Sequence, residues 1–447
     1  MQISRRFGFF ICAGLLSVAI HGCGGSSSKD TIPSTVSIFY GHSLIFRNHT
    51  TFTMGYNGFG QLGDGTLTRR EIATLVPGMT GMIKGVAGNE HTMVTNGSAV
   101  YSWGYNLFGQ LGNSEASTSY PDAYKSSPVQ VNFPDTITSV ADIAAGGDHS
   151  LAAADGKLYA WGYNGNRQLG NSSTTNAKTP VHVAVGHEGE NLSLLSAKEV
   201  AAGGTHSLAL FDNGDVYAWG NNKYAQVGFS EPGFSNYSSA YSSPRKVTIS
   251  GATGKIDHIA ALSSASLALE VQRDVDNNII SQTLWGWGYN DRGELGPDIV
   301  YGTDDGKVKG TSSAMPKRVF PTLTVTDASS VVIKKIATGI NHILLLMGPR
   351  DTVVNDGTWY VKAIGLNSAG QLGNDTTKSS FELVRTLDSG GALMTNVSDI
   401  AAYGKSSFAL IGGVWYGWGN NSLGQLGNPV QKDTIAFYEL PVTVKFQ

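Results

Sequence analysis

A ten-residue pattern that begins with Trp-Gly or a close variant recurs seven times along this chain of 447 residues. Two clear copies are WGYNLFGQLG from Trp103 and WGYNGNRQLG from Trp161. Glycines separated by four residues suggest a phosphate-binding loop, but no copy has the lysine and Ser/Thr that such a loop needs after its second glycine. The seven copies instead indicate an internal structural repeat. Its leading glycines are 55, 104, 162, 220, 288, 365 and 419.

A second repeated element is phased with the first and completes a four-stranded unit. It reads VAAGGTHSLAL at 200–210 and IAAGGDHSLAA at 143–153. Turn pairs such as Asn96-Gly97 and Asp155-Gly156 follow it, and these are strong signals for a tight hairpin. A short outer segment, such as PVQV at 128–131, ends the unit. Four antiparallel strands repeated radially are typical of a propeller blade, so the pattern predicts an all-β fold. The 57 glycines of the chain agree with so many turns.

These units resemble the repeats of the regulator-of-chromosome-condensation family, over roughly residues 36–447. The resemblance implies a seven-bladed β-propeller. The first unit starts with no outer strand before it, and PVTV at 441–444 follows the last unit without a partner. We therefore expect this C-terminal strand to pair with the N-terminal blade and to close the ring. The propeller is then one domain, 36–447.

The repeated histidines and tryptophans are interpreted as structural residues. Equivalent residues of different blades lie a blade apart and cannot converge on a metal ion, so we expect buried histidines bonded to nearby backbone, with no metal and no cofactor. The tryptophans are expected to pack between blades. The Gly and Asn positions of the motif are expected to adopt left-handed backbone. The histidines are His42, His91, His149, His206 and His342, and two units have Ala265 and Ser406 instead.

The N-terminus has the features of an export signal. Arg5 and Arg6 precede an apolar segment that is too short to span a bilayer. Gly22-Cys23 followed by Gly and Ser resembles a bacterial lipobox, although His21 departs from that pattern. We therefore expect a signal peptide at 1–22, lipidation of Cys23 and a Gly/Ser linker at 23–35. The chain would be an outer-membrane-anchored lipoprotein of the bacterial envelope. An ordinary secretory signal, giving a secreted or periplasmic protein, is the alternative.

Comparison of the units exposes loops that differ between them, and these loops carry the predicted binding site. Long insertions follow the ten-residue motif at 113–127, 229–243 and 297–315, and a shorter one lies at 171–179. They occupy the same place in the repeat, so they should emerge on one face, and their Tyr, Phe, Ser and Asn content is typical of binding surfaces. The predicted partner-binding residues are Tyr120, Tyr124, Phe229, Phe234, Tyr237, Tyr241 and Tyr301.

The favoured function is a non-enzymatic module that binds a protein partner, in a monomeric chain. A net charge of −3 gives no reason to expect nucleic acid, and no catalytic motif is present. The resemblance implies binding of proteins through a propeller face, since relatives include a secreted β-lactamase inhibitor and exchange factors of a small GTPase. Export would separate this chain from a GTPase, so exchange is not expected.

Two alternatives stay open. One is an inhibitor of a periplasmic or secreted enzyme. The other is a carbohydrate-active hydrolase, for which Asp298, Asp304 and Asp305 are the local concentration of carboxylates. The segment DVDNN at 274–278 resembles the start of a calcium loop but lacks the glycine and glutamate that follow there, so it is interpreted as a hairpin tip.

Overall fold

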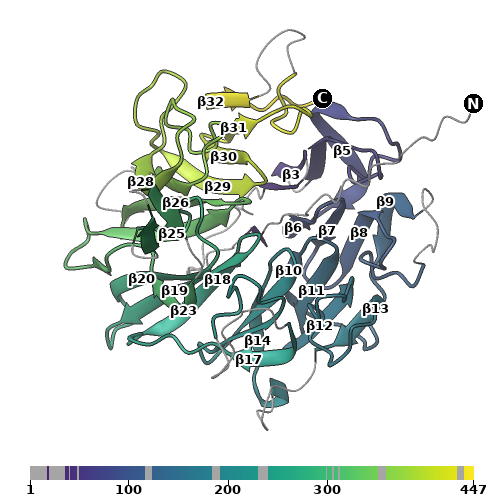
Figure 1. Cartoon of the computed structure of the whole chain (residues 1–447). Coiled ribbons are helices and arrows are strands. Elements are labelled where there is room, and N and C mark those ends of the chain that lie inside the picture. Colours follow the sequence, from purple (N-terminus) through teal and green to yellow (C-terminus); the bar gives the residue numbers. More distant parts are fainter. Residues whose placement is uncertain are drawn as a thin grey trace, which may run out of the picture.

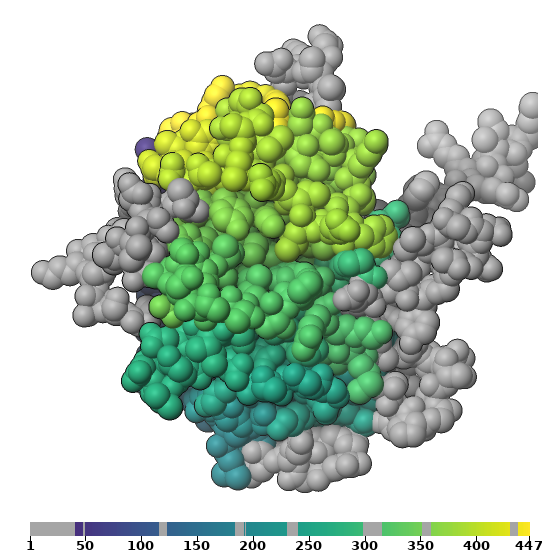
Figure 2. Space-filling view, turned by 90° about the vertical axis from the view of Figure 1, so that its left-hand side faces the viewer, coloured from purple at the N-terminus to yellow at the C-terminus, as the bar shows by residue number. Residues whose placement is uncertain are grey.

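Seven β-sheets surround a common axis in the computed structural model (Figure 1). The structure describes residues 18–19, 36–39, 41–47, 50–115, 123–183, 192–229, 240–297, 300–304, 307–310, 313–350, 359–429 and 437–447. Figure 2 views the ring from the side, where consecutive blades follow one another from teal at the bottom to yellow at the top. The predicted all-β propeller of seven blades is confirmed.

Each blade contains four consecutive antiparallel strands, from the innermost to the outermost. Blade 1 consists of β2 (Val36–Phe39), β3 (His42–Arg47), β4 (Thr50–Gly55) and β5 (Arg70–Thr80). Blade 2 consists of β6 (Lys84–Ala87), β7 (His91–Thr95), β8 (Val100–Tyr105) and β9 (Tyr124–Gln130). Blade 3 consists of β10 (Val140–Ala145), β11 (His149–Ala154), β12 (Lys157–Gly162) and β13 (Ala177–His182). Blade 4 consists of β14 (Ala197–Ala202), β15 (His206–Phe211), β16 (Val216–Gly220) and β17 (Tyr241–Lys246).

Blades 5 to 7 have the same order, with additions. Blade 5 consists of β18 (Lys255–Ala261), β19 (Ala265–Arg273), β20 (Ile279–Gly288) and β23 (Ser313–Arg318). Blade 6 consists of β25 (Val331–Thr338), β26 (His342–Pro349), β27 (Tyr360–Gly365) and β28 (Ser380–Arg385). Blade 7 consists of β29 (Val397–Tyr403), β30 (Ser406–Ile411), β31 (Val414–Asn420) and β32 (Phe437–Thr443). The additions are β24 (Leu323–Thr324) on β20, the separate hairpin of β21 (Val300–Asp304) and β22 (Lys307–Gly310), and the 3-10 helix η2 (Leu192–Leu194). The short strand β1 (Val18–Ala19) pairs with β25.

The ring closes differently from the sequence-based expectation. The C-terminal strand β32 pairs with β31 of its own blade, and blade 1 has its own outer strand, β5. The prediction that the C-terminal strand completes the N-terminal blade is therefore wrong. The reason is that the outer strand of every unit follows the ten-residue motif, so the first unit already contains one. Only the last residues reach blade 1, where Ala73 N donates to Lys445 O and Gln447 N donates to Ala73 O.

The ten-residue motif builds a turn in which its glycines and its asparagine act differently. Gly104, Gly109 and Gly112 have φ angles of 102°, 86° and 68°, a region that favours glycine. The motif asparagine does not share this backbone, so that expectation is wrong. Instead, Asn106 Oδ1 accepts the N–H of Leu111 at 3.0 Å, and its Nδ2 donates to Glu115 O at 3.1 Å. The asparagine closes the turn through its side chain.

Neighbouring blades are joined by a hydrogen-bond arrangement that we call the interblade clasp. At the junction of blades 2 and 3, His91 Nε2 lies 3.0 Å from Ser150 Oγ, and this hydroxyl donates to Gln110 O at 2.9 Å. Trp161 Nε1 donates to the same carbonyl at 2.9 Å. The predicted packing of tryptophan between blades is confirmed. The histidine, however, contacts a hydroxyl of the next blade rather than nearby backbone.

The clasp histidine is protonated at Nε2, and its lowered pKa keeps the ring neutral. Because the serine hydroxyl donates to a carbonyl, the histidine Nε2–H must be the donor to that hydroxyl. Burial lowers the pKa of His91 and of His149 to about 3. The ring also lies flat against the preceding backbone, where a Cβ on Gly88 would come within 2.1 Å of it. This contact explains why the repeated segment reads Gly-x-x-His.

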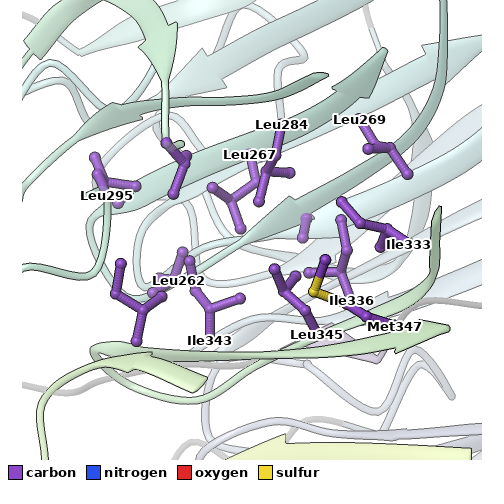
Figure 3. Close-up of a cluster of buried hydrophobic side chains, with 14 of the residues drawn as sticks. Leu262, Leu267, Leu269, Leu284, Leu295, Ile333, Ile336, Ile343, Leu345 and Met347 are labelled. Atoms are coloured by element: carbon purple, nitrogen blue, oxygen red, sulfur yellow. The ribbon is translucent and has the colours of Figure 1, made fainter. Parts of the chain in front are cut away.

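The clasp occurs at five of the seven junctions, and at the other two it is absent or incomplete. Blade 5 has Ala265 in place of the histidine, and blade 6 has Ile343 and Ile364 in place of the serine and tryptophan. An apolar cluster fills that junction instead, with Leu267 and Leu295 of blade 5 facing Ile343 and Leu345 of blade 6 (Figure 3). Between blades 7 and 1, Met54 replaces the tryptophan, and the hydroxyl of Ser43 still donates to Gln425 O. Thus, where one unit has the clasp histidine, the next unit has the clasp tryptophan.

Charged side chains of the innermost strands form a second link between blades. We call these residues the inner belt: Lys84, Asp142, Glu199, His258, Lys335 and Asp399. They are all buried and occupy the same register in successive blades. They pair across alternate junctions, as Lys84 with Asp142, Glu199 with His258, and Lys335 with Asp399. Asp142 Oδ2 also accepts Val200 N at 3.0 Å, so the buried carboxylate reaches a third blade.

Among the residues that the structure places, no helix has the length and apolar character needed to cross a membrane. The predicted signal peptide at 1–22 and the linker at 23–35 with Cys23 lie outside the described residues, apart from β1. Cleavage before Cys23, as the sequence predicts, would remove β1 from the propeller.

Candidate functional site

Two sets of connections emerge on one face of the ring, which we call the turn face. In a four-stranded antiparallel sheet, the turn between the first and second strands lies at the same end as the connection between the third and fourth. Hydrogen bonds join these two segments in each blade: Tyr105 N donates to Glu90 O at 2.7 Å, and Tyr163 N donates to Asp148 O at 2.8 Å. The tight hairpins, such as Asn96-Gly97, lie on the opposite face, which we call the hairpin face.

The predicted insertions all begin and end on the turn face. They connect β8 to β9, β12 to β13, β16 to β17 and β20 to β23. Of the seven predicted binding residues, Tyr120, Phe234 and Tyr237 lie outside the described residues. Tyr124 begins β9 and is half-buried, and Tyr301 lies in β21 of the inserted hairpin. The shared origin of the insertions is confirmed, and the binding role of these residues stays a prediction.

Two of the predicted residues pack within the propeller. The rings of Phe229 and Tyr241 meet at a centroid distance of 4.7 Å, and Arg245 lies 4.6 Å above the Tyr241 ring. Tyr241 is only 8% exposed and belongs to the core cluster of blades 4 and 5. It is therefore a packing residue and not an exposed contact for a partner. The fourth strand begins earlier than the sequence comparison indicated, so that Tyr241 belongs to β17 rather than to the insertion.

A row of half-buried aromatic rings crosses blades 1 to 3 on the turn face. We call it the aromatic arc: Tyr56, Phe59, Tyr105, Phe108 and Tyr163. Consecutive ring centroids are 6.4, 4.9, 6.3 and 4.9 Å apart. The two short distances cross blade junctions, from Phe59 to Tyr105 and from Phe108 to Tyr163. All five residues come from the ten-residue motif.

The fold does not require aromatic residues at these positions. Blade 6 has Leu366 and Ala369 there, and blade 7 has Asn420 and Leu423. These blades make the same backbone bond, since Leu366 N donates to Asn341 O and Asn420 N donates to Lys405 O. The scaffold therefore does not require rings at these positions, and outside the arc of blades 1 to 3 a similar ring pair, Tyr224 and Tyr289, joins blades 4 and 5. A partly exposed set of aromatic rings of this kind is typical of a binding surface.

Two acidic residues, Glu90 and Asp148, are hydrogen-bonded through their backbone carbonyls to Tyr105 and Tyr163 of the aromatic arc. Glu90 and Asp148 occupy equivalent positions, one residue before the clasp histidines of blades 2 and 3. Burial raises the pKa of Glu90 to about 7, helped by the negative charge of Asp148. Burial raises the pKa of Asp148 to about 6. Blades 4 to 6 have the neutral residues Thr205, Ser264 and Asn341 at this position, so the acidic pair is specific to blades 2 and 3.

The residues considered for catalysis or metal binding are not assembled into a site in the described part of the chain. Asp298 and Asp305 lie outside it, and Asp304 ends β21. No group of three His, Cys, Asp or Glu residues among the described residues could hold a metal ion. The segment 274–278 is the tip of the β19–β20 hairpin, as predicted, where the Asp274 carboxylate accepts Asn278 N at 2.8 Å.

Two features of the propeller, one on the turn face and one in its interior, went unrecognised in the sequence, although signals for both were present. The aromatic arc is visible as Tyr after Trp-Gly and Phe before Gly-Gln in the first units. The inner belt is visible as a charged residue at a fixed place before each Ala-Ala-Gly segment, as in DIAAG at 142–146 and EVAAG at 199–203. A charge at a constant register in an otherwise apolar strand indicates pairing between blades.

Comparison with known families agrees with this architecture. The model of the regulator of chromosome condensation (RCC1) repeat matches residues 98–153, 155–210 and 213–269. A second RCC1 repeat model matches 140–168 and 197–226. Protein RCC2 of Mus musculus is 28% identical over 290 residues, which are 61% of this chain and 48% of that protein. The ultraviolet-B receptor UVR8 of Arabidopsis thaliana is 26% identical over 311 residues, 69% of this chain and 58% of the receptor.

Solved structures show the same fold. Yeast RCC1 (Prp20), in a crystal structure with Kap60, superposes with a TM-score of 0.65 at 22% identity, over 96% of this chain and 91% of that chain. Human WBSCR16 gives a TM-score of 0.62 at 22% identity, over 83% and 85% of the two chains. The chain spans about half the length of RCC2, the first curated relative that it matches. With its seven phased repeats and its ring of seven blades, the chain belongs to the family of RCC1-repeat propellers.

Proposed function

We propose that this chain is a non-enzymatic propeller that binds a protein partner through its turn face and is displayed on a bacterial cell envelope. The observation that carries the proposal is the coincidence of three features on one face. The ends of the inserted loops, the aromatic arc and the Glu90–Asp148 pair all lie there. Since the scaffold needs none of them, binding gives a reason for their presence.

The relatives support a binding role in a limited way. One curated relative is named a receptor, and one solved neighbour was crystallised with its partner Kap60. Those names say what the two relatives do or bind, and they do not name a partner for this chain. For this chain they favour a propeller that acts through contacts with other proteins, and the partner's identity is open.

Capture of a partner is expected to depend on the turn face. Replacing Tyr120, Phe234 and Tyr237 together by alanine should abolish capture of a partner from envelope extract by the propeller, because aromatic anchors supply much of the binding energy of an interface. The measurement is a pull-down analysed by mass spectrometry. The matched control is Val275→Ser, which removes a fully exposed apolar side chain from the hairpin face. Undiminished capture by the triple variant would move the binding site away from these loops. A captured hydrolase, inhibited in its own assay, would identify the chain as an enzyme inhibitor.

Display on the envelope is expected to depend on Cys23. The variant Cys23→Ser cannot accept lipid, so the protein should move from the membrane fraction to the soluble fraction of the envelope while its propeller remains folded. Fractionation followed by immunoblotting measures the shift, with mass spectrometry of the N-terminal peptide as a direct test for lipid. Cys12→Ser is the control, because that cysteine lies within the predicted signal peptide. Membrane association that survives Cys23→Ser would contradict the lipid anchor.

A further inference from the structure

We infer that the blade 2–3 sector of the turn face recognises a basic segment of the partner, with arginine or lysine side chains placed between the aromatic arc and the Glu90–Asp148 pair. This inference rests on the proposed function and names the chemistry of the partner.

Backbone hydrogen bonds hold the acidic residues next to the aromatic arc in the chain fold, and the charge of Asp148 acts on Glu90. The hydrogen bond from Tyr105 N to Glu90 O spans 2.7 Å, and the bond from Tyr163 N to Asp148 O spans 2.8 Å. Each acidic residue is thus joined through its backbone to a residue of the aromatic arc. The Phe108 ring bridges the two blades, 6.3 Å from Tyr105 and 4.9 Å from Tyr163. A guanidinium group contacts a ring face and a carboxylate at the same time in such a surrounding, because it is flat and weakly hydrated.

The electrostatics favours a cation over a neutral or acidic ligand. Burial raises the pKa of both carboxyl groups, and the charge of Asp148 raises the pKa of Glu90 further. A bound cation would stabilise both carboxylates in their charged form. A carbohydrate would leave the repulsion between the two carboxylates unrelieved.

The chain itself provides an example of this contact in the next blade. Lys223 Nζ lies 5.4 Å from the centroid of the Tyr224 ring, which occupies the position of Phe59 and Phe108 in blade 4. The Tyr224 ring in turn contacts Tyr289 at 4.9 Å, as the rings of the arc contact one another. A ring at this position therefore accommodates a cation, and blade 4 carries its own.

Rings and acidic residues occur together only in the blade 2–3 sector of the turn face. Blade 6 has neither, with Asn341 and Leu366 at these positions. Blades 1 and 5 also carry rings, Tyr56 and Tyr289, but beside the uncharged Gly41 and Ser264, so the combination of ring and carboxylate is particular to blades 2 and 3.

The test uses the purified propeller and short peptides of one length as probes. A fluorescent arginine-glycine peptide is expected to bind the propeller, whereas serine-glycine and glutamate-glycine peptides are expected not to bind. Fluorescence anisotropy at low and high salt measures the binding of each peptide. Glu90→Gln with Asp148→Asn should weaken binding of the arginine probe by about tenfold or more, since charge-assisted contacts are lost. Tyr105→Leu with Phe108→Leu should weaken it similarly. Leucine occupies these positions as Leu366 in blade 6 and Leu423 in blade 7, so the fold accepts it.

The control is Asp276→Asn, which removes an exposed carboxylate from the hairpin face and should leave binding unchanged. Equal binding of the three peptides, or equal binding by both turn-face variants and the parent, would overturn the inference. If the arginine probe does not bind while the propeller still captures a partner that the loop variant loses, the basic segment is wrong and the proposed function stands. If the loop variant also captures normally, the proposed function fails as well.

Discussion

Replacement of Trp161 by alanine is expected to lower the free energy of unfolding by about 3–5 kcal/mol, the usual cost of removing a large aromatic side chain from a core. Trp161 is fully buried at the junction of blades 2 and 3. The cavity would open where Gly112 packs against the indole, since a Cβ on Gly112 would lie 2.7 Å from Trp161 Nε1. The indole donor to Gln110 O would also be lost.

Two further variants divide this effect into its parts. Trp161→Phe keeps most of the ring but not the donor, and should cost less than the alanine variant. Ser150→Ala keeps the tryptophan but leaves the buried His91 Nε2 without its acceptor, and should cost about 1–3 kcal/mol. The Ser150→Ala and Trp161→Phe variants should both have a higher thermal midpoint than Trp161→Ala. Circular dichroism and differential scanning calorimetry measure these midpoints. A Trp161→Ala protein that melts like the parent would show that the clasp does not hold these blades together.

Replacement of Lys84 by methionine is expected to be as damaging, at about 3–5 kcal/mol, because it leaves a buried carboxylate without its cation. Lys84 and Asp142 are both largely buried, with side chains 7% exposed. Burial already raises the pKa of Asp142 to about 6 in spite of the lysine. The double variant Lys84→Met with Asp142→Leu should recover much of the loss, because paired removal leaves no buried charge.

The matched control is Lys157→Met. Lys157 pairs with Asp135 at 2.9 Å, but its side chain is 56% exposed, so the loss should be below about 1 kcal/mol. Chemical denaturation of the three variants and the parent measures the differences. If Lys84→Met and Lys157→Met lose the same stability, or if the double variant is worse than Lys84→Met alone, the inner belt does not act as buried ion pairs.

The number of blades and the strand order within them could be predicted from the sequence. Seven copies of two phased elements, with tight-turn pairs between them, leave little freedom in how the strands pair locally. The packing role of the tryptophans followed from the same repetition. The closure of the ring did not follow. PVTV at 441–444 looked unpaired because the outer strands vary most between units, and a long connection separates β31 from β32, its partner in the same blade.

The candidate site was predicted only in outline. Comparison of the units located the insertions and their common face, because differences between copies can be read without a structure. It also assigned Tyr241 to the insertion, whereas the ring is buried against Phe229 beneath Arg245. The aromatic arc was missed because its residues lie inside the repeated ten-residue motif, whose residues were interpreted as structural.

The sequence by itself thus determined the local structure: the strands, the hairpins, the glycine turns and the seven-fold repetition, all of which depend on neighbouring residues. Only the tertiary structure decided which residues meet across blades. His91 meets Ser150, Trp161 meets Gln110, and Lys84 meets Asp142, although 42 to 65 residues separate the partners of such contacts around the ring. The physical reason is that these contacts depend on the angle and distance at which rigid blades pack, and the closed ring sets both.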